Sequence, residues 1–526
     1  MKAKRLIEVA LPIKEISAES VRDKSIRHGH ISTLHLWWAR RPLPVCRAVV
    51  FASLVPDPLD SNCPVSFKDA VKSLLSPEND NITNYMYKPY NDIPYTAIVD
   101  PMEDNLRNRL MMFIGKFSDS CQKNMLAGKT TAPKDQLTDG SLIKWENKNN
   151  PAVLRIAREL IWVAYNAEKH PELGYETHHN NFTKAFEAVN DAENALYNMT
   201  DRHLHSAEVD DLEHNLQEAI DDFQSQMPSV FDPFAGGGAI PLEAARLGCR
   251  SYGNDINPVA HIIEKGSAEF PQKYGKPLYI SEKELLSLYG EKILEVLPQK
   301  SIYKDTRGYY MIPNRLAFDV EHYAKKILSA TEEEVGYMYP ADKDGNKPIA
   351  YYWARTATCS NPSCGAEVPL LKGFYMVNKK GKQIYLDPKI NGKEISFEVK
   401  KGTCHVNGWN NRCTLTCPCC GNLTTPAMLK EQFKAGKTGE RLLAVICEDA
   451  NGKSYRLPNQ SEKDILSRVP KDSPRPSVMM EVKNTRNFNT PGWGINNYGQ
   501  IFTDRQITVL DKLVENLAQL HKSVAI

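Results

Sequence analysis

The stretch that decides the fold runs over thirty residues and reads Ser229-Val-Phe-Asp-Pro-Phe-Ala-Gly-Gly-Gly-Ala-Ile-Pro-Leu-Glu-Ala-Ala-Arg-Leu-Gly-Cys-Arg-Ser-Tyr-Gly-Asn-Asp-Ile-Asn-Pro258. A short apolar run at 229–231 predicts a strand, and the glycines after it predict a tight turn. Residues 239–247 then predict a helix and 249–253 a second strand. A β-α-β unit of this length is typical of the opening of a Rossmann-like parallel sheet.

The glycine-rich turn lies at the carboxyl end of the first predicted strand, where a ligand can approach main chain that a Cβ would block. Asp255 follows the second strand, where such folds place the carboxylate that accepts hydrogen bonds from ribose hydroxyls. The turn lacks the Gly-Lys-Ser/Thr of a P-loop, and Pro241 replaces the third glycine of a dinucleotide site. The plainer alternative is a tight turn in which Asp255 only caps the helix that starts at Pro258.

Length and composition set wide limits. The 526 residues, of 59.4 kDa, suffice for two to four domains. With 66 Lys plus Arg against 64 Asp plus Glu, the net charge is only +2, so nucleic-acid affinity would have to come from local basic patches. The sequence has no apolar run long enough to span a bilayer and no signal peptide, which predicts a cytoplasmic protein without a membrane partner.

Eight of the twelve cysteines fall between Cys359 and Cys447. In a cytoplasmic chain such clustering favours metal over disulfides. Two short loops carry Cys359 with Cys364 and Cys417 with Cys420, a spacing that suits a four-thiolate, structural Zn²⁺ site. Four further cysteines remain alternative ligands: Cys404, Cys413, Cys419 and Cys447. Unliganded core cysteines are the competing interpretation.

Periodicity predicts the other elements. Helices are expected at 152–168, 182–197, 207–223, 281–296, 316–331 and 504–520, the last opening with a capping box of Thr503 and Gln506. Alternating strands joined by hairpin turns are expected at 374–377, 384–386 and 395–399. Residues 59–150 predict an irregular insertion with short helices.

The turn and the acidic segment after it resemble motif I and the following acidic motif of S-adenosylmethionine-dependent amino-methyltransferases that act on DNA. A second run, Ser25-Ile-Arg-His-Gly-His30 with Leu34-His-Leu-Trp-Trp-Ala-Arg-Arg-Pro42, resembles the opening of the zinc-ribbon adenine-specific DNA methylases. The resemblance extends over nearly the whole chain and is weakest at 59–150.

The resemblance implies a set of S-adenosylmethionine contacts. Asp232 would lie near the methionine amine and Asp255 would hold the ribose. Trp37 or Trp38 could cover the adenine, and Arg40 and Arg41 suit a carboxylate or phosphate. The remaining expected cofactor-binding residues are Pro233, Phe234, Gly236, Gly238 and Asn257. His28, His30 and His35 lack interleaved carboxylates or thiols and make a poor metal site.

The implied activity is transfer of a methyl group to the exocyclic amine of adenine in DNA, in a restriction-modification or phage-defence system. The family orients that amine with an Asp/Asn/Ser-Pro-Pro-Tyr/Phe motif, which this sequence lacks. A truncated or split enzyme is therefore expected, with its catalytic residues unknown and the motif supplied by a second polypeptide. The alternatives are a non-catalytic zinc-ribbon DNA-binding or scaffolding subunit and, less well matched, an RNA or protein methyltransferase.

The expected fold class is α/β, a Rossmann-like methyltransferase domain with helical insertions and an inserted β-rich zinc ribbon. The expected segments are an N-terminal methylase motif (1–58), a mainly helical insertion (59–226), the S-adenosylmethionine-binding domain (227–345), the zinc ribbon (346–430) and a C-terminal segment that ends in a helix (431–526).

Overall fold

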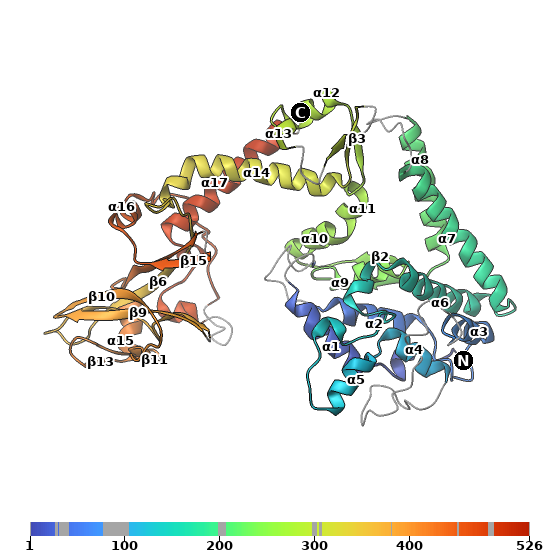
Figure 1. Ribbon diagram of the computed structural model, residues 1–526, viewed down its shortest axis with the longest axis horizontal. Coiled ribbons are helices and arrows are strands. Elements are labelled where there is room, and N and C mark those ends of the chain that lie inside the picture. The colour runs from blue at the N-terminus through green and yellow to red at the C-terminus, as the bar shows by residue number, and fades with distance from the viewer. Residues whose placement is uncertain are drawn as a thin grey trace. The chain divides into compact units, whose positions relative to one another are not determined.

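The structure is a computed structural model, and the parts of the chain that it describes are residues 2–26, 30, 41–76, 105–197, 207–296, 302–304, 308–379, 381–449, 452–481 and 489–524 (Figure 1). The chain divides into two compact units, Met1–Val320 and Glu321–Ile526. Each unit is described separately below.

The first unit is mainly helical. Its α-helices are α1 (Ile13–Ser25), α2 (Leu43–Leu54), α3 (Val65–Leu74), α4 (Leu106–Ile114), α5 (Asp119–Leu126), α6 (Pro151–Lys169), α7 (Tyr175–Tyr197), α8 (Ala207–Ser225), α9 (Ala239–Arg246), α10 (Pro258–Glu264), α11 (Phe270–Tyr274), α12 (Glu282–Tyr289) and α13 (Ile293–Val296). Short 3₁₀ turns lie at Leu6–Glu8, Pro133–Asp135 and Trp145–Asn149, and a π-helical turn at Lys265–Glu269. The predicted helical hairpin is confirmed, because α7 and α8 pack side by side.

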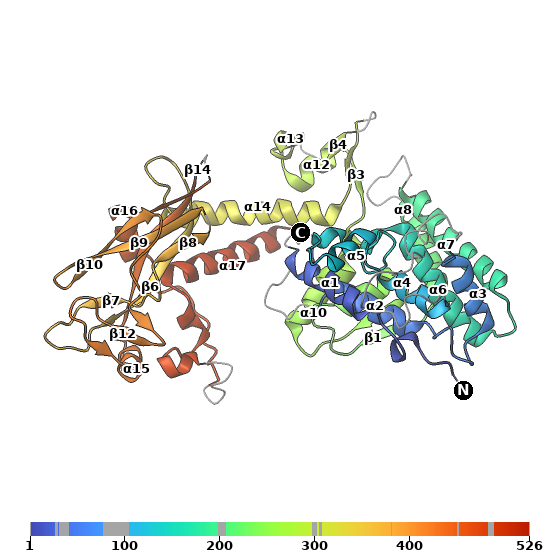
Figure 2. The same cartoon turned by 60° about the horizontal axis from the view of Figure 1, so that its bottom comes forward.

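One hydrophobic core joins helices α1 to α9 of this unit. It extends from Ala3 to Cys249 and includes the fully buried rings of Phe51, Phe113 and Trp162. Figure 2 shows α1 and α2 side by side, and α2 also contacts α6 and α9. The expected segments 1–58 and 59–226 and the start of 227–345 therefore share one core.

The β-α-β unit is present where the sequence predicts it. Strand β1 (Ser229–Asp232) pairs in parallel with β2 (Arg250–Gly253), and α9 connects them. Among the described residues these two strands pair only with each other. A wider Rossmann-like sheet therefore stays a prediction.

A second small sheet follows in the same unit. It has the order β3-β5-β4 and is antiparallel, with β3 (Leu278–Ile280), β4 (Tyr303–Lys304) and β5 (Tyr310–Ile312). Ile280, Leu285 and Ile312 form the buried centre of its own small core. Helix α14 (Arg315–Val335) starts after it and continues into the second unit.

The second unit is built on an antiparallel sheet in the order β15-β14-β6-β7. The strands are β6 (Pro348–Thr358), β7 (Glu367–Pro369), β14 (Gly439–Asp449) and β15 (Gly452–Arg456). Two more antiparallel sheets are β8 (Tyr375–Lys379), β9 (Lys382–Asn391) and β10 (Glu394–Lys401), and β11 (Asn410–Asn411), β12 (Thr414–Thr416) and β13 (Leu423–Thr424). The hairpins predicted in 374–399 are confirmed, since β8, β9 and β10 pair in sequence order.

Helices complete this unit: α15 (Pro426–Lys434), α16 (Gln460–Arg468) and α17 (Asp504–Val524), with 3₁₀ turns at Gly336–Met338, Thr490–Trp493 and Tyr498–Ile501. The predicted capping box of α17 is present. The backbone N–H of Gln506 donates to the Thr503 hydroxyl, and the backbone N–H of Thr503 donates to Gln506 Oε1. The α17 residue Asn516 donates to Thr331 on α14 over 3.1 Å. None of the described helices combines the length and the apolarity that crossing a membrane requires.

Candidate functional site

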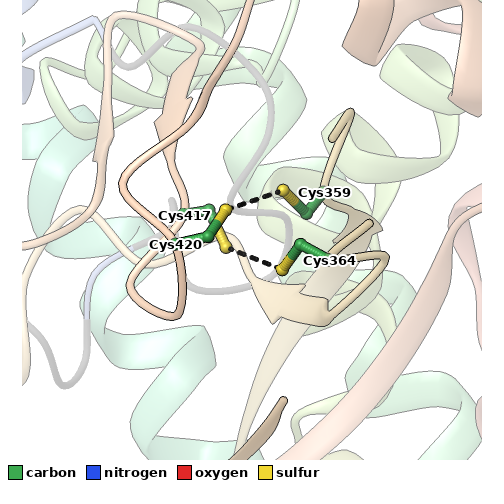
Figure 3. Close-up of side chains that lie close together, drawn as sticks. All are labelled: Cys359, Cys364, Cys417 and Cys420. Atoms are coloured by element: carbon green, nitrogen blue, oxygen red, sulfur yellow. Dashed lines mark hydrogen bonds between the residues drawn. The ribbon is translucent and has the colours of Figure 1, made fainter. Parts of the chain in front are cut away.

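The four cysteines predicted as zinc ligands converge in the second unit. The sulfur atoms of Cys359, Cys364, Cys417 and Cys420 all lie within 4.8 Å of one another. Figure 3 shows them as two facing pairs, with 3.6 Å between the sulfurs of Cys359 and Cys420 and 3.8 Å between those of Cys364 and Cys417. Four thiolates bound tetrahedrally at 2.3 Å from zinc would stand about 3.8 Å apart. The cluster can therefore hold one metal ion.

Tight turns of the main chain place these thiols. In the first loop the N–H groups of Cys364 and Gly365 both donate to the carbonyl of Asn361, and Gly365 has φ +58°. In the second loop Gly421 N donates to the Cys417 carbonyl, and Gly421 has φ +74°. Glycine adopts the left-handed region at little energetic cost, whereas other residues do not. The glycine after each second cysteine therefore fixes the turn of its loop.

The surroundings of the thiols affect their readiness to ionise. A backbone N–H of Asn422 lowers the pKa of Cys420 to about 7, whereas burial raises the pKa of Cys359 to about 12. Metal ligation needs thiolates, so a bound cation would supply the charge that stabilises the buried members of the cluster. The side-chain amide of Asn361 lies 3.9 Å from Cys420 Sγ and supports it from outside the cluster.

The four alternative cysteines lie outside this cluster. Cys404 donates its thiol to the carbonyl of Val406, Cys413 is exposed in a hairpin turn, and Cys447 is buried in β14. Cys419 lies between two cluster members, and burial raises its pKa to about 11. Among the described residues, the group with metal-binding spacing is the set of four that the sequence predicted.

The glycine-rich turn in the first unit connects β1 to α9. Gly236 and Gly238 have φ +57° and +75°, and Gly238 is the residue that precedes the helix. A Cβ on Gly238 would lie 3.1 Å from the Ser267 hydroxyl, whereas one on Gly237 would meet nothing within 4 Å. Gly236 and Gly238 are therefore required by their left-handed backbone conformation. Gly237 leaves open space where a side chain would otherwise lie.

Asp255 ties this turn to the one after β2. Its Oδ2 accepts from Gly236 N and its Oδ1 from Asn257 N, both over 2.9 Å. Asn257 caps α10 by accepting from Val259 N over 2.9 Å. The residue that caps α10 is thus Asn257. Each carboxylate oxygen of Asp255 accepts one hydrogen bond from a main-chain N–H. A carboxylate has about four acceptor positions, so lone pairs remain for a ligand.

Asp232 ends β1 with one satisfied and one unsatisfied oxygen. Oδ1 accepts from Phe234 N over 3.0 Å, and Oδ2 is buried with no hydrogen-bond partner among the described residues. An unpaired buried carboxylate oxygen costs desolvation free energy that a cationic or N–H donor would recover. Pro233 and Phe234 are exposed beside it, with the Phe234 ring 73% exposed.

Glu264 is a neighbour that sequence reasoning missed. It is buried on α10, and its carboxylate lies against the α-carbon of Gly253 at the end of β2, where any Cβ would collide with it. Burial, opposed in part by His261 and reinforced by the charges of Asp232 and Asp255, raises its pKa. Three carboxyl groups thus face one small region. Nothing in the spacing of the sequence marks Glu264 as part of it.

Trp37 and Arg40, expected over the cofactor, lie outside the described residues, as do His28 and His35. His30 is described and buried: its Nε2 lies 3.0 Å from Asp23 Oδ2, and its ring stacks on Trp145 with 5.6 Å between centroids. His30 is therefore a buried histidine held by an acid and an aromatic ring.

The helix that follows this run, α2, packs on α9 directly beneath the glycine-rich turn. Arg47 of α2 and Glu243 of α9 form a fully buried ion pair with Nε and Oε2 2.5 Å apart. The N-terminal segment and the β-α-β unit are therefore joined by both apolar packing and a buried charge pair.

Comparison with known proteins gives one match. A family model described as a protein of unknown function, DUF1156, matches residues 10–76. The match covers α1, α2 and α3, all three of which contribute to the core of the first unit, and α2 packs on α9. No curated protein and no solved structure matches the chain.

Proposed function

We propose that this chain is the cofactor-binding and zinc-ribbon part of an S-adenosylmethionine-dependent amino-methyltransferase that acts on adenine in DNA. The observation that carries the proposal is the glycine-rich turn, with two left-handed glycines, Asp255 bonded across it and an unpaired buried oxygen on Asp232. These three features belong together in a site for a ligand with an ammonium group and a ribose.

Each residue has a defined task in this proposal. Asp232 Oδ2 accepts a hydrogen bond from the methionine ammonium, which satisfies the buried oxygen. Gly236 and Gly238 let the ligand approach the main chain, and Asp255 uses its remaining lone pairs for the ribose hydroxyls. Bound S-adenosylmethionine supplies a methyl group on a sulfonium, and the chain's contribution is to bind and orient it.

The metal in this proposal is zinc with a structural role. All four positions are filled by protein thiolates, which leaves no open position for water or substrate. The chelated loops come from the ends of β6 and β12, so the metal holds the ribbon's sheets together.

The zinc ribbon also supplies a basic surface for DNA. Residues 372–412 contain eight Lys and one Arg against three acidic residues, although the whole chain is nearly neutral. Lys389 and Lys400 lie on β9 and β10 and share Asp387, at 3.0 and 2.6 Å. Exposed lysines of this density suit phosphate contacts, whose strength falls with salt.

A second candidate is a non-catalytic DNA-binding or scaffolding subunit. Two observations favour it: both oxygens of Asp255 already accept main-chain hydrogen bonds, and the carboxylate of Glu264 lies against Gly253. The sequence also contains no Pro-Pro-aromatic motif to orient an exocyclic amine. In either case we expect little methyl transfer by this chain without a second polypeptide that carries such a motif.

Calorimetric titration with S-adenosylmethionine separates the two candidates. The cofactor-binding proposal expects saturable binding that Asp232→Asn and Asp255→Asn each weaken by roughly 10- to 100-fold, the effect of losing a hydrogen bond to a charged group. The matched control is Asp210→Asn, on the exposed surface of α8. Absence of binding at millimolar ligand would favour the non-catalytic subunit.

Metal analysis tests the ribbon independently of the cofactor. One zinc per chain is expected, with Cys417→Ser lowering the content sharply and Cys404→Ser leaving it unchanged. A purified chain with well under one zinc would contradict the structural role.

A further inference from the structure

A cavity in the second unit combines aromatic walls with a buried arginine. It has a volume of about 360 Å³ and lies between β6, the segment around Tyr339 and the first turn of α17. Cavities of this size accept small ligands of the nucleotide class. None of the features assigned above to the cofactor turn or the metal cluster lines it.

The period of a strand produces one wall. Tyr351, Trp353 and Arg355 alternate along β6 and therefore point to the same face of the sheet. The Trp353 ring offers a surface on which a base can stack, and Arg355 beside it can meet a phosphate. Arg355 is only half buried, with Glu440 on the neighbouring strand 3.4 Å away.

Arg505 forms the opposite wall. Its guanidinium stacks between Tyr339 and Tyr351, 4.4 and 4.1 Å from the ring centroids, and it is 93% buried since only 7% of it is exposed. Nη1 donates to the Met338 carbonyl over 3.1 Å, and within the described residues no carboxylate pairs with it. A buried cation without an acidic partner is costly, and an anion in the cavity would compensate it.

The start of α17 adds to the positive potential. This helix has 21 residues, and its first turn supplies Thr503, Arg505 and Gln506 to the lining. Thr503 accepts from Gln506 N, and the positive end of the helix dipole lies at the cavity that these residues line. The guanidinium of Arg505 and the N-terminus of α17 would therefore both attract an anionic group in the cavity.

We propose that this cavity binds a nucleotide unit, with its base on the Trp353 ring and its phosphate at Arg505 and Arg355. The inference does not rest on S-adenosylmethionine binding, since every residue that carries it lies in the second unit. The unit can come from a free nucleotide or from single-stranded DNA. A second cavity of about 400 Å³ shares Trp353 and Glu440, which leaves room for a neighbouring nucleotide of a strand.

Binding to the zinc-loaded full chain tests the proposal with two probes, dAMP by calorimetry and a fluorescein-labelled dT12 strand by anisotropy. We expect both to bind, with dAMP displacing part of the strand. Trp353→Leu should weaken both roughly tenfold, the loss of one stacked base. Arg355→Gln should weaken both several-fold and reduce the salt dependence of strand binding by about one phosphate contact.

Two controls keep the result interpretable. Trp493→Leu removes a tryptophan of the same unit that does not line the cavity, and Arg468→Gln removes an exposed arginine of α16. Zinc content reports whether each variant is folded. Arg355 is exposed enough for its replacement to leave the fold intact.

Three outcomes would overturn the proposal. One is no binding of either probe at millimolar dAMP or micromolar strand. Another is binding that neither cavity variant changes, which would place the strand on the lysine-rich hairpin instead. The third is inorganic phosphate competing as well as dAMP, which would mean an anion site without a place for a base.

Discussion

Glu15 lies on the face of α1 that is turned into the core, four residues before Glu19 and eight before Asp23. All three acids are at least 98% buried, and neither carboxylate oxygen of Glu15 has a hydrogen-bond partner among the described residues. Burial raises the pKa of Glu15 to about 7, against the opposing effects of the backbone N–H of Glu15 and the charge of Lys14. The free energy of folding therefore depends on the proton of this one group.

The pH dependence has a definite sign. The unfolded chain releases the proton near pH 4.5 and the folded chain near 7, so the folded state binds more protons in between. The stability that this proton confers is complete below pH 4.5 and is lost as pH rises through 7. Wild type should lose up to about 3 kcal/mol over that range relative to Glu15→Gln, by urea unfolding at successive pH values. Glu187→Gln, exposed on α7, should show no such difference.

The backbone is strained at Cys413, at the tip of the β11–β12 hairpin, and a substitution there can measure that strain. Arg412 and Cys413 have φ +46° and +63°, so two ordinary residues occupy a two-residue turn that prefers glycine. Cys413→Gly should raise the free energy of unfolding of the ribbon by about 1 kcal/mol. Cys413→Ser, which keeps the Cβ, should not. Both variants should retain a full zinc content, and a loss in either would mean that Cys413 is a ligand after all.

At the scale of elements, the contact between α2 and α9 depends on the ion pair of Arg47 and Glu243. Both side chains are at least 99% buried. Arg47 also donates to the Leu142 carbonyl over 2.8 Å, and Glu243 also pairs with Arg246. Removing Glu243 leaves Arg47 as a charge in the core without a carboxylate, whereas removing Arg47 leaves Glu243 still paired with Arg246. The first change is therefore the more costly one.

A double-mutant cycle measures this contact. Glu243→Met should destabilise the first unit by about 3–5 kcal/mol, because it leaves the buried Arg47 without a carboxylate, and Arg47→Met should cost less because Arg246 still pairs with Glu243. The double variant Arg47→Met/Glu243→Met should recover part of that loss, by thermal or urea unfolding. If the two single effects simply add, the helices are held by apolar packing alone and the ion pair is incidental.

At the scale of the whole molecule, the two units have separate cores. Phe51 and Trp162 belong to the core of Met1–Val320, and Phe374 and Trp409 to that of Glu321–Ile526. Only the second unit contains the cysteine cluster. Units with independent cores generally unfold as separate cooperative steps.

Removal of zinc by a chelator should therefore affect only the unfolding of the second unit. Calorimetry is expected to show two unfolding transitions, and a strong zinc chelator should lower or abolish the one assigned to the second unit. Arg47→Met should move the other transition and leave the chelator-sensitive one unchanged. A single transition that shifts as a whole with chelator would show that the two units unfold together.

Local patterns were sufficient where neighbouring residues decide the structure. Spacing within a few residues was enough to predict five features: the β-α-β unit, the helical hairpin, the capping box of α17, the β8–β9–β10 hairpins and the cysteine loops. Turn glycines and strand alternation are short-range properties of the chain, so a sequence expresses them directly. The four cysteines that cluster were identified for the same reason.

Other features depended on which distant residues meet. The sequence did not indicate that Arg47 would pair with Glu243, 196 residues away, or that Glu264 would lie against Gly253. It also gave no sign that Tyr339, β6 and the start of α17 would enclose one cavity around Arg505. The acidic residues of α1 do share a helical face, but an amphipathic pattern alone would assign that face to solvent.

Short-range sequence patterns are enough to specify the local parts of this protein: the glycine-rich turn after β1, the two loops that can hold a metal, and the strands and helices that carry them. The tertiary structure alone decided the burial of Glu15, the pairing of α2 with α9, the shared core from Ala3 to Cys249 and the cavity at Arg505. The physical reason is that burial and desolvation depend on what packs around a group, and those neighbours are brought together only when the whole chain folds.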